Sequence, residues 1–328
     1  MLKVDGLRRC WIALLSVNII FPFLVSPVRA GHMEGIPPGE QRVSPPISLK
    51  KVAPDLYFLY DDASSNAAFL VTEEGVLVVD TRQHPRHGQD LIERIRKITD
   101  KPIRWAVVTH FHGDHYLGSP AFKEAGAMIV SHRDTAAMIK KYHEQEVARR
   151  QAFFKTNNLD PKEVKLVLPD ATFEQGQMTI NLGGRVVQLL YMGPGQNPGD
   201  TFVHFPQART LFTGGPFSRK SWPNTAFTPS MDGWIAVLKK LAAMDMDHYL
   251  PGHGDVGNKQ DLLDEAKVLG DLQSGVKAAM AKGMSREEMV KSLYFREYKE
   301  LRNYDRLHGF IESTYQILTT GKSAFGLP

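Results

Sequence analysis

The stretch THFHGDH, residues 109–115, places three imidazole groups and one carboxylate within six positions. It follows the run WAVV (residues 105–108), whose apolar and β-branched side chains predict a short buried strand. The four polar groups therefore lie on the loop that leaves the carboxyl end of this strand. Imidazole and carboxylate are ligands that zinc and similar divalent metals accept. Four such groups so close together favour a pair of metals over a single one.

This stretch resembles the metal-binding HxHxDH motif of the metallo-β-lactamase superfamily. The resemblance covers roughly residues 50–258 and implies an αββα four-layer sandwich, an α/β fold, with metals at one edge between the two sheets. It also implies a first metal on His110 and His112, and a second metal on Asp114, His115 and His253. The last of these histidines stands between two glycines after a short strand, where this family carries a ligand of the second metal. Three protein ligands and one open position are what a catalytic zinc needs.

The expected third ligand of the first metal is replaced. The family places a histidine in a G-x-G-H-T-x-G-D stretch, and the matching run GPGQNPGD (residues 193–200) has Gln196 at that position. An amide oxygen is a weaker neutral donor than imidazole. Two alternatives follow: Gln196 still lines or ligates the site, or His110 and His112 alone hold a weak metal or none. The sequence therefore predicts one tight zinc and a second, weaker one.

A second departure follows the strand LFT at residues 211–213. Many hydrolases of the family carry an aspartate that bridges both metals where this chain has Gly215, and one β-lactamase subclass carries cysteine where it has Pro216. A third subclass has neither and uses only the Asp-His-His set for its second metal, as this sequence does. The missing bridge argues against thioester hydrolysis of the glyoxalase II kind without excluding it.

The resemblance implies a zinc-dependent hydrolase in which metal-bound hydroxide attacks a cyclic amide, a lactone or another ester, with β-lactams among the candidates. Asp114 is the expected catalytic residue, because it binds the second metal and orients the nucleophile. Asp80 ends a buried strand and is expected to hydrogen-bond a ligand histidine. Candidate substrate contacts are His84, on the loop after Asp80, and Arg219 and Lys220, on a loop that faces substrate in relatives; the alternative for all three is a solvated loop.

The chain divides into four expected parts: a signal peptide (1–30), a flexible leader (31–48), the metallo-β-lactamase-like domain (49–258) and a C-terminal helical extension packed on it (259–328). Strands are expected at 56–60, 68–71, 76–80 and 105–108, with a helix at 88–99 between the last two. A second series of strands is expected at 164–168, 178–180, 186–191, 201–205 and 211–212. Secreted family members with a long helical C-terminus carry a closing helix like the one expected at 303–318.

The first thirty residues have the pattern of a secretory signal peptide: Lys3, Arg8 and Arg9 precede an apolar run, and VRA (residues 28–30) offers small residues for cleavage. Removing them takes four of the 40 basic residues and one of the 36 acidic ones, and it removes the single cysteine. The remainder is nearly neutral, which argues against a nucleic-acid partner. We expect a periplasmic or secreted protein with a small-molecule substrate and no membrane attachment after cleavage; the alternative is a retained membrane anchor.

A different class of function stays open. The two departures at the site favour a degenerate relative that binds a metal or a small ligand, within a periplasmic redox or sulfur pathway, and turns over little. The intact histidine stretch and His253 favour the hydrolase. The sequence does not specify the oligomeric state.

The exported protein is expected to begin at or near Gly31, because the charged start, the apolar run and the VRA ending together favour cleavage after Ala30. N-terminal sequencing of protein recovered from the periplasm tests this cleavage site. An intact Met1 in a membrane fraction would instead identify the segment as an anchor.

Overall fold

The computed structural model describes residues 47–325. The predicted signal peptide and nearly all of the predicted leader lie outside the described residues. Within residues 47–325, none of the helices has both the length and the apolar character needed to cross a membrane.

Seven strands form the first sheet, in the order β1-β2-β3-β4-β5-β6-β7. The strands β1 to β4 form an antiparallel meander, whereas β4, β5, β6 and β7 run parallel to one another. Their bounds are β1 Ser48–Ala53, β2 Leu56–Tyr60, β3 Ala67–Thr72, β4 Gly75–Val79, β5 Ile103–Val108, β6 Met128–His132 and β7 Ala171–Phe173. Because β4, β5 and β6 are parallel, the loops that follow them meet at one edge of the sheet.

Five strands form the second sheet, in the order β12-β11-β10-β9-β8. Only β11 and β12 are parallel, so the carboxyl ends of these two strands lie at the same edge. The bounds are β8 Gln177–Leu182, β9 Arg185–Leu190, β10 Phe202–Phe205, β11 Thr210–Ser218 and β12 His248–His253.

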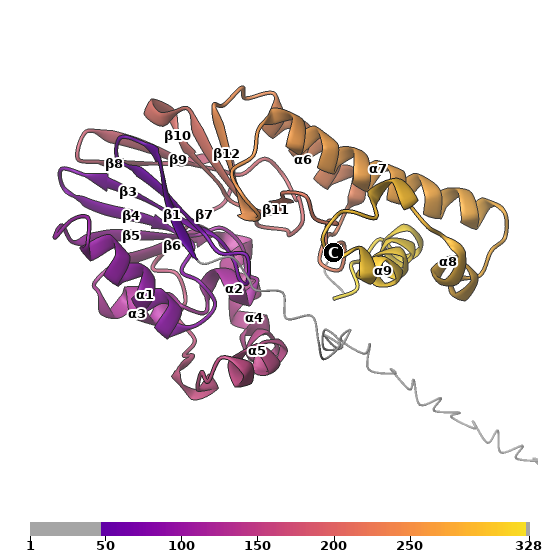
Figure 1. Ribbon diagram of the computed structural model, residues 1–328, viewed down its shortest axis with the longest axis horizontal. Helices are drawn as coiled ribbons and strands as arrows, with labels where there is room; N and C mark the ends of the chain where they lie inside the picture. Colours follow the sequence, from indigo (N-terminus) through magenta and orange to yellow (C-terminus); the bar gives the residue numbers. More distant parts are fainter. Residues whose placement is uncertain (1–46, 326–328) are drawn as a thin grey trace, which may run out of the picture. The chain divides into compact units, whose positions relative to one another are not determined.

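The two sheets pack face to face, and helices cover their outer faces (Figure 1). Alternation along β4 illustrates the arrangement: Leu77 and Val79 contact the second sheet, whereas Val76 and Val78 face the helices. All four of these side chains are fully buried, and burying each contributes about 1.5–3 kcal/mol to the free energy of unfolding. This arrangement confirms the predicted αββα sandwich.

Helices from the first half of the described chain cover the first sheet, and a group from its end lies on the side of the second sheet, where its last two members pack mainly against other helices (Figure 1). The first group is α1 Pro85–Arg96, α2 Gly113–Tyr116, α3 Ser119–Glu124, α4 Arg133–Arg149 and α5 Gln151–Thr156. The second group is α6 Met231–Ala242, α7 Lys259–Ala281, α8 Arg286–Ser292 and α9 Leu307–Thr320.

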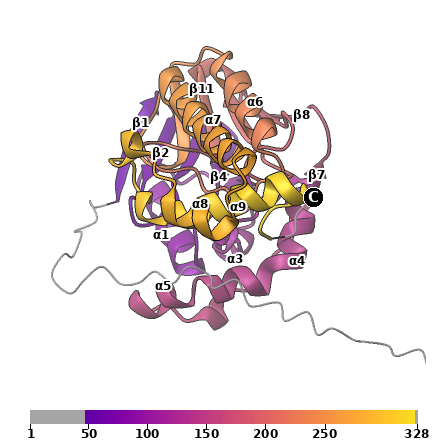
Figure 2. The same cartoon turned by 90° about the vertical axis from the view of Figure 1, so that its right-hand side faces the viewer.

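The helices α7, α8 and α9 form the expected C-terminal helical region, which Figure 2 shows in front of the sheets. A capping box at Asn258 and Asp261 starts α7. Its apolar side packs with α6 and α9 in one continuous core that includes Trp222 and Trp234. Glu265 joins this helix to the second sheet, because its Oε2 accepts a hydrogen bond from the N–H of Ser218 at 2.9 Å.

Two local predictions are wrong. Residues 164–168 form no strand: Val164 is buried, but Leu166 and Leu168 are 45% and 41% exposed, so the apolar alternation has no second layer to pack against. The helix expected at 88–99 begins earlier, at Pro85, because the ring of His84 accepts a hydrogen bond from the N–H of Arg86 and caps it.

Glu265 is expected to make stability fall as pH rises. Burial raises the pKa of this carboxyl well above its ordinary value of 4.5, although the Ser218 N–H lowers it. Above pH 4.5 the unfolded chain releases the proton that the folded protein retains, so the free energy of unfolding decreases with pH. Glu265→Gln keeps an acceptor for Ser218 and removes the titration. Thermal unfolding between pH 5 and pH 8 should therefore show a steeper loss of Tm in the wild type than in this variant.

The matched control is Asp264→Asn, which changes the neighbouring exposed carboxylate of α7. Its pH profile should follow that of the wild type. Parallel profiles for the wild type and Glu265→Gln would contradict the assignment.

Candidate metal centre

Asp80 positions the histidine loop, which is residues 109–115. It follows β4, and its Oδ2 accepts hydrogen bonds from Nδ1 of His115 at 2.6 Å and from Oγ1 of Thr109 at 2.9 Å. Since the Thr109 hydroxyl gives its one proton to Asp80, it accepts from Nδ1 of His110, which lies 2.9 Å away. Both histidines thus carry their proton on Nδ1 and keep the Nε2 lone pair for a metal. The predicted hydrogen bond between Asp80 and a histidine of the motif is confirmed.

The structure brings Asp114, His115 and His253 together. Nε2 of His253 lies 3.3 Å from Oδ2 of Asp114 and 3.4 Å from Nε2 of His115, and the remaining distance, from His115 Nε2 to Asp114 Oδ2, is 3.7 Å. A tetrahedral zinc with bonds of about 2.0–2.1 Å requires ligand atoms about 3.3–3.4 Å apart. The three atoms therefore have the spacing of three corners of such a site. The His253 side chain is 33% exposed, which leaves one side of the set open.

The other histidines of the motif offer a second set of donors. Nε2 of His110 and Nε2 of His112 are buried and have no hydrogen-bond partner within residues 47–325. Such orphaned nitrogens are costly unless something binds them, so they fit a metal. A Cβ on Gly215 would lie closer than 3.0 Å to both His110 Nε2 and Gln196 Oε1. The amide oxygen thus reaches the same space as the imidazole, and glycine at 215 leaves room for it.

Gln196 is held loosely. Its Nε2 donates to the carbonyl of Asn224 at 3.4 Å, and its Oε1 accepts from Asn197 at the same distance. The neighbouring turn is firmer, because Asp200 accepts from the backbone and the side chain of Asn197, at 2.8 Å in both cases. Asp200 therefore fixes the turn and leaves the Gln196 side chain free to adjust.

Two charged residues of the centre were not anticipated from the sequence. Arg150, the residue between α4 and α5, donates from Nη2 to Oδ1 of Asp114. Glu146, one turn earlier on α4, accepts from the N–H of Gly113 at 2.7 Å and pairs with Arg149. No motif marks these positions, because a helix end distant in sequence brings them to the loop.

Burial shapes the charge state of the centre. It lowers the pKa of His110 and His112 well below the ordinary value, and it lowers that of His115 to about 3, so all three are neutral imidazoles at neutral pH. Burial also raises the pKa of Asp80 to about 7, and a bound cation would favour its ionised form. For Asp114, burial opposes ionisation, but Arg150 and the nearby histidines outweigh it and hold the pKa well below its usual range.

Loops from the first sheet also position His253. The side chain of Asn66 donates to the carbonyls of Pro251 and Gly254, at 2.9 and 2.7 Å. The carbonyl of Ser64 lies 3.2 Å from Nδ1 of His253 and sets the orientation of its ring. The hydroxyl of Ser65 donates to the carbonyl of Asp114, so the segment between β2 and β3 connects the end of β12 to residues 109–115.

The three predicted substrate-binding residues, His84, Arg219 and Lys220, have surroundings that differ from one another. His84 is fully buried, and both its ring nitrogens are engaged, one with Arg86 and the other with the carbonyl of Asp160 at 3.0 Å. It supports the start of α1. The side chain of Arg219 pairs with Asp261 of α7 at 3.1 Å, while its N–H donates to the carbonyl of His253. Lys220 is exposed.

An aromatic wall closes the side next to His112. Phe227 lies with its ring centroid 4.1 Å from that of His112 and stacks on Phe325 at 4.4 Å. The Arg149 guanidinium covers both phenylalanine rings. The position beside His110 and His112 is thus enclosed, whereas the set of Asp114, His115 and His253 has an open side.

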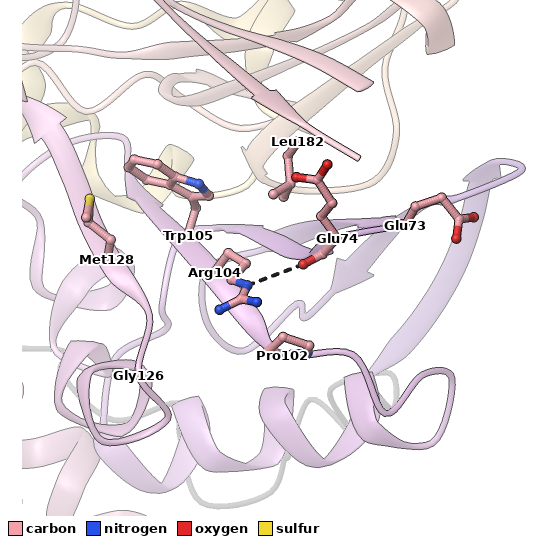
Figure 3. Close-up of a pocket in the computed structure, with 8 residues that line it drawn as sticks. All are labelled: Glu73, Glu74, Pro102, Arg104, Trp105, Gly126, Met128 and Leu182. Carbon is pink, nitrogen blue, oxygen red and sulfur yellow. Dashed lines mark hydrogen bonds between the residues drawn. The ribbon is translucent and has the colours of Figure 1, made fainter. Parts of the chain in front are cut away.

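A separate cavity of about 750 Å³ lies at the other end of β5 (Figure 3). Its lining includes Glu74, Arg104, Trp105 and Met128, and Arg104 donates to the Glu74 carbonyl. The cavity lies at the amino end of β5, whereas residues 109–115 follow the carboxyl end of this strand. The cavity and the candidate ligands are therefore at opposite ends of β5. It contains none of the candidate ligands.

Comparisons with known proteins agree with the fold and the motif. The family model of the metallo-beta-lactamase superfamily matches residues 60–253. The linear primary-alkylsulfatase of Pseudomonas sp. is 24% identical over 272 residues, which cover 69% of this chain and 51% of that protein. The metallo-beta-lactamase type 2 of Bacillus cereus is 26% identical over 220 residues, covering 65% of this chain and 76% of that protein.

Among solved structures, the sec-alkylsulfatase Pisa1 of Pseudomonas sp. is similar with a TM-score of 0.67 and 17% identity, over 84% of this chain and 50% of that chain. This likeness shows the fold. The chain spans about half the length of both alkylsulfatases.

Gln196→His should raise the affinity of the first metal position, because an imidazole would replace an amide oxygen beside His110 and His112. A gain of about tenfold, or ~1.4 kcal/mol, is expected. Calorimetric titration of zinc into metal-free protein tests this: the wild type should show one tight and one weaker site, and the variant two tight ones. Gln207→His, which changes an exposed glutamine between β10 and β11, is the control. Identical isotherms for the wild type and Gln196→His would mean that residue 196 does not reach the metal.

Proposed function

The chain belongs to the metallo-β-lactamase superfamily, and we propose that it is an exported, zinc-dependent hydrolase of an ester or a cyclic amide. One observation carries the proposal: Asp114 Oδ2, His115 Nε2 and His253 Nε2 are spaced as ligands of one tetrahedral zinc and have an open side. The predicted signal peptide supports export.

Zinc bound here would bring the pKa of a coordinated water towards neutrality and polarise the bond to be cleaved. The chain's own residues supply the setting. Asp80 holds His115 in one tautomer, and Arg150 fixes one oxygen of Asp114 so that the other faces the histidines. Burial keeps the histidines neutral, which leaves their lone pairs available. The partial exposure of His253 gives a substrate access from its side.

Substrate classes come from the relatives. The Bacillus cereus relative is named a β-lactamase, and two Pseudomonas relatives are named alkylsulfatases. We therefore take β-lactams and sulfate esters as candidates, beside the lactones expected from the sequence.

A second candidate function is metal or ligand binding with little turnover, in a periplasmic redox or sulfur pathway. Two observations favour it: Gln196 offers only an amide oxygen to the first position, and Arg150 neutralises the Asp114 carboxylate. A protein that retains zinc but hydrolyses none of the three substrate classes would support this function.

Activity should require both Asp114 and His253. Removing either ligand is expected to lower kcat/KM by about 1,000-fold, since the metal contributes several kcal/mol to charge stabilisation and each 1.4 kcal/mol corresponds to about tenfold in rate. The measurement is hydrolysis of a chromogenic β-lactam, an aryl sulfate and a lactone by the wild type, Asp114→Ala and His253→Ala, with zinc counted by mass spectrometry.

His248→Ala is the matched control, because it alters a histidine at the opposite end of β12. It should keep both zinc and activity. Full activity in Asp114→Ala or His253→Ala would refute the proposed metal set.

A further inference from the structure

Arg150 is a fixed cation inside the candidate centre. Its backbone joins two helices: its N–H donates to Val147 of α4 at 3.1 Å, and its carbonyl accepts from Phe154 of α5 at 2.8 Å. The side chain is 23% exposed, so solvent or a ligand can reach it. Its Nε is buried and has no partner in the described part of the chain, and among those residues it forms an ion pair only with Asp114.

The two oxygens of Asp114 have different partners. Oδ2 faces His115 and His253, whereas Oδ1 accepts from Arg150. If a metal is held by Oδ2, the single negative charge of this carboxylate has to neutralise both the metal and the guanidinium of Arg150. Arg150 would then carry, directly beside the metal, a positive charge that no other contact within residues 47–325 neutralises.

A guanidinium has five N–H donors in a planar fork that matches sulfate, phosphate and carboxylate oxygens. Within the described residues only Nη2 of Arg150 makes a side-chain hydrogen bond, to Asp114, so Nη1, which is not among the buried unpartnered atoms, is the donor that a ligand can reach. We propose that Arg150 binds an oxyanion group of the substrate next to the scissile bond, so that the substrate class is anionic.

This inference rests on the proposed function and narrows it. Sulfate esters and the carboxylates of β-lactams share the required chemistry, whereas a neutral lactone lacks it. Arg149 is the poorer anion-binding group, because Glu146 neutralises its charge and its guanidinium already lies over the rings of Phe227 and Phe325.

A consequence for binding is independent of turnover. Zinc bound to Asp114 would leave the charge of Arg150 less well neutralised, so zinc should strengthen the binding of sulfate at Arg150. Sulfate should strengthen the binding of zinc to the same extent. We expect about a tenfold coupling, within the usual range for linked sites.

The experiment measures zinc affinity by calorimetry with and without inorganic sulfate, and again with acetate as the carboxylate probe. The wild type should show the coupling, and Arg150→Leu should lose it. Arg150→Lys, which keeps the charge without the fork, should retain part of it. Arg133→Leu, at the opposite end of α4 and paired with Glu174, is the matched control and should behave as the wild type.

Steady-state kinetics at full zinc occupancy supply the second readout. Arg150→Leu should lower kcat/KM for an aryl sulfate or a β-lactam about tenfold more than for a neutral aryl ester or lactone; the anionic substrate that shows this loss identifies the oxyanion. Coupling in Arg150→Leu equal to that of the wild type, or equal losses for charged and neutral substrates, would overturn the inference and leave the hydrolase standing. Arg150-dependent coupling without turnover of any substrate would support the anion site and reject the hydrolase.

Discussion

Asp80 ties two neighbouring strands of the first sheet together at the point where the candidate ligands begin. Its N–H donates to Val107 of β5 at 2.8 Å, and its carboxylate accepts from the N–H of Thr109 at 2.9 Å and from Nδ1 of His115 at 2.6 Å. A buried carboxylate needs such donors, because burial without them is costly. The same bonds direct Nε2 of His110 and His115 into the centre. The metal site thus depends on the pairing of β4 with β5.

The ligand His253 comes from the second sheet, at the edge where the two sheets bring their loops together. Parallel strands in both sheets end at the same edge, so the loops after β4, β5, β11 and β12 meet there. Asn66 joins the sheets at this point, since it contacts the loop that carries His253 through both its backbone and its side chain. A ligand set split between two sheets is sensitive to how the sheets pack. The apolar layer between them is therefore part of the site's support.

Much of the fold and the local part of the site could be predicted from the sequence, because strand periodicity and motif spacing are local properties. The motif His110–His115 and the glycine-flanked His253 are of this kind. Arg150 could not be predicted, since its contact with Asp114 depends on where α4 ends in space. His84 lies on the predicted loop, but the contact of its ring with the carbonyl of Asp160 depends on a segment distant in the sequence and could not be predicted either. Segment 164–168 alternates like a strand yet has no partner strand.

We expect Asp114, His115 and His253 to hold one zinc ion. Diffraction at the zinc absorption edge, from crystals of the zinc-loaded protein, tests it most directly. An anomalous peak is expected in contact with Asp114 Oδ2, His115 Nε2 and His253 Nε2, with any weaker peak beside His110 and His112. A crystal with one zinc per chain and no peak at Asp114, His115 and His253 would show that these residues are not the zinc ligands.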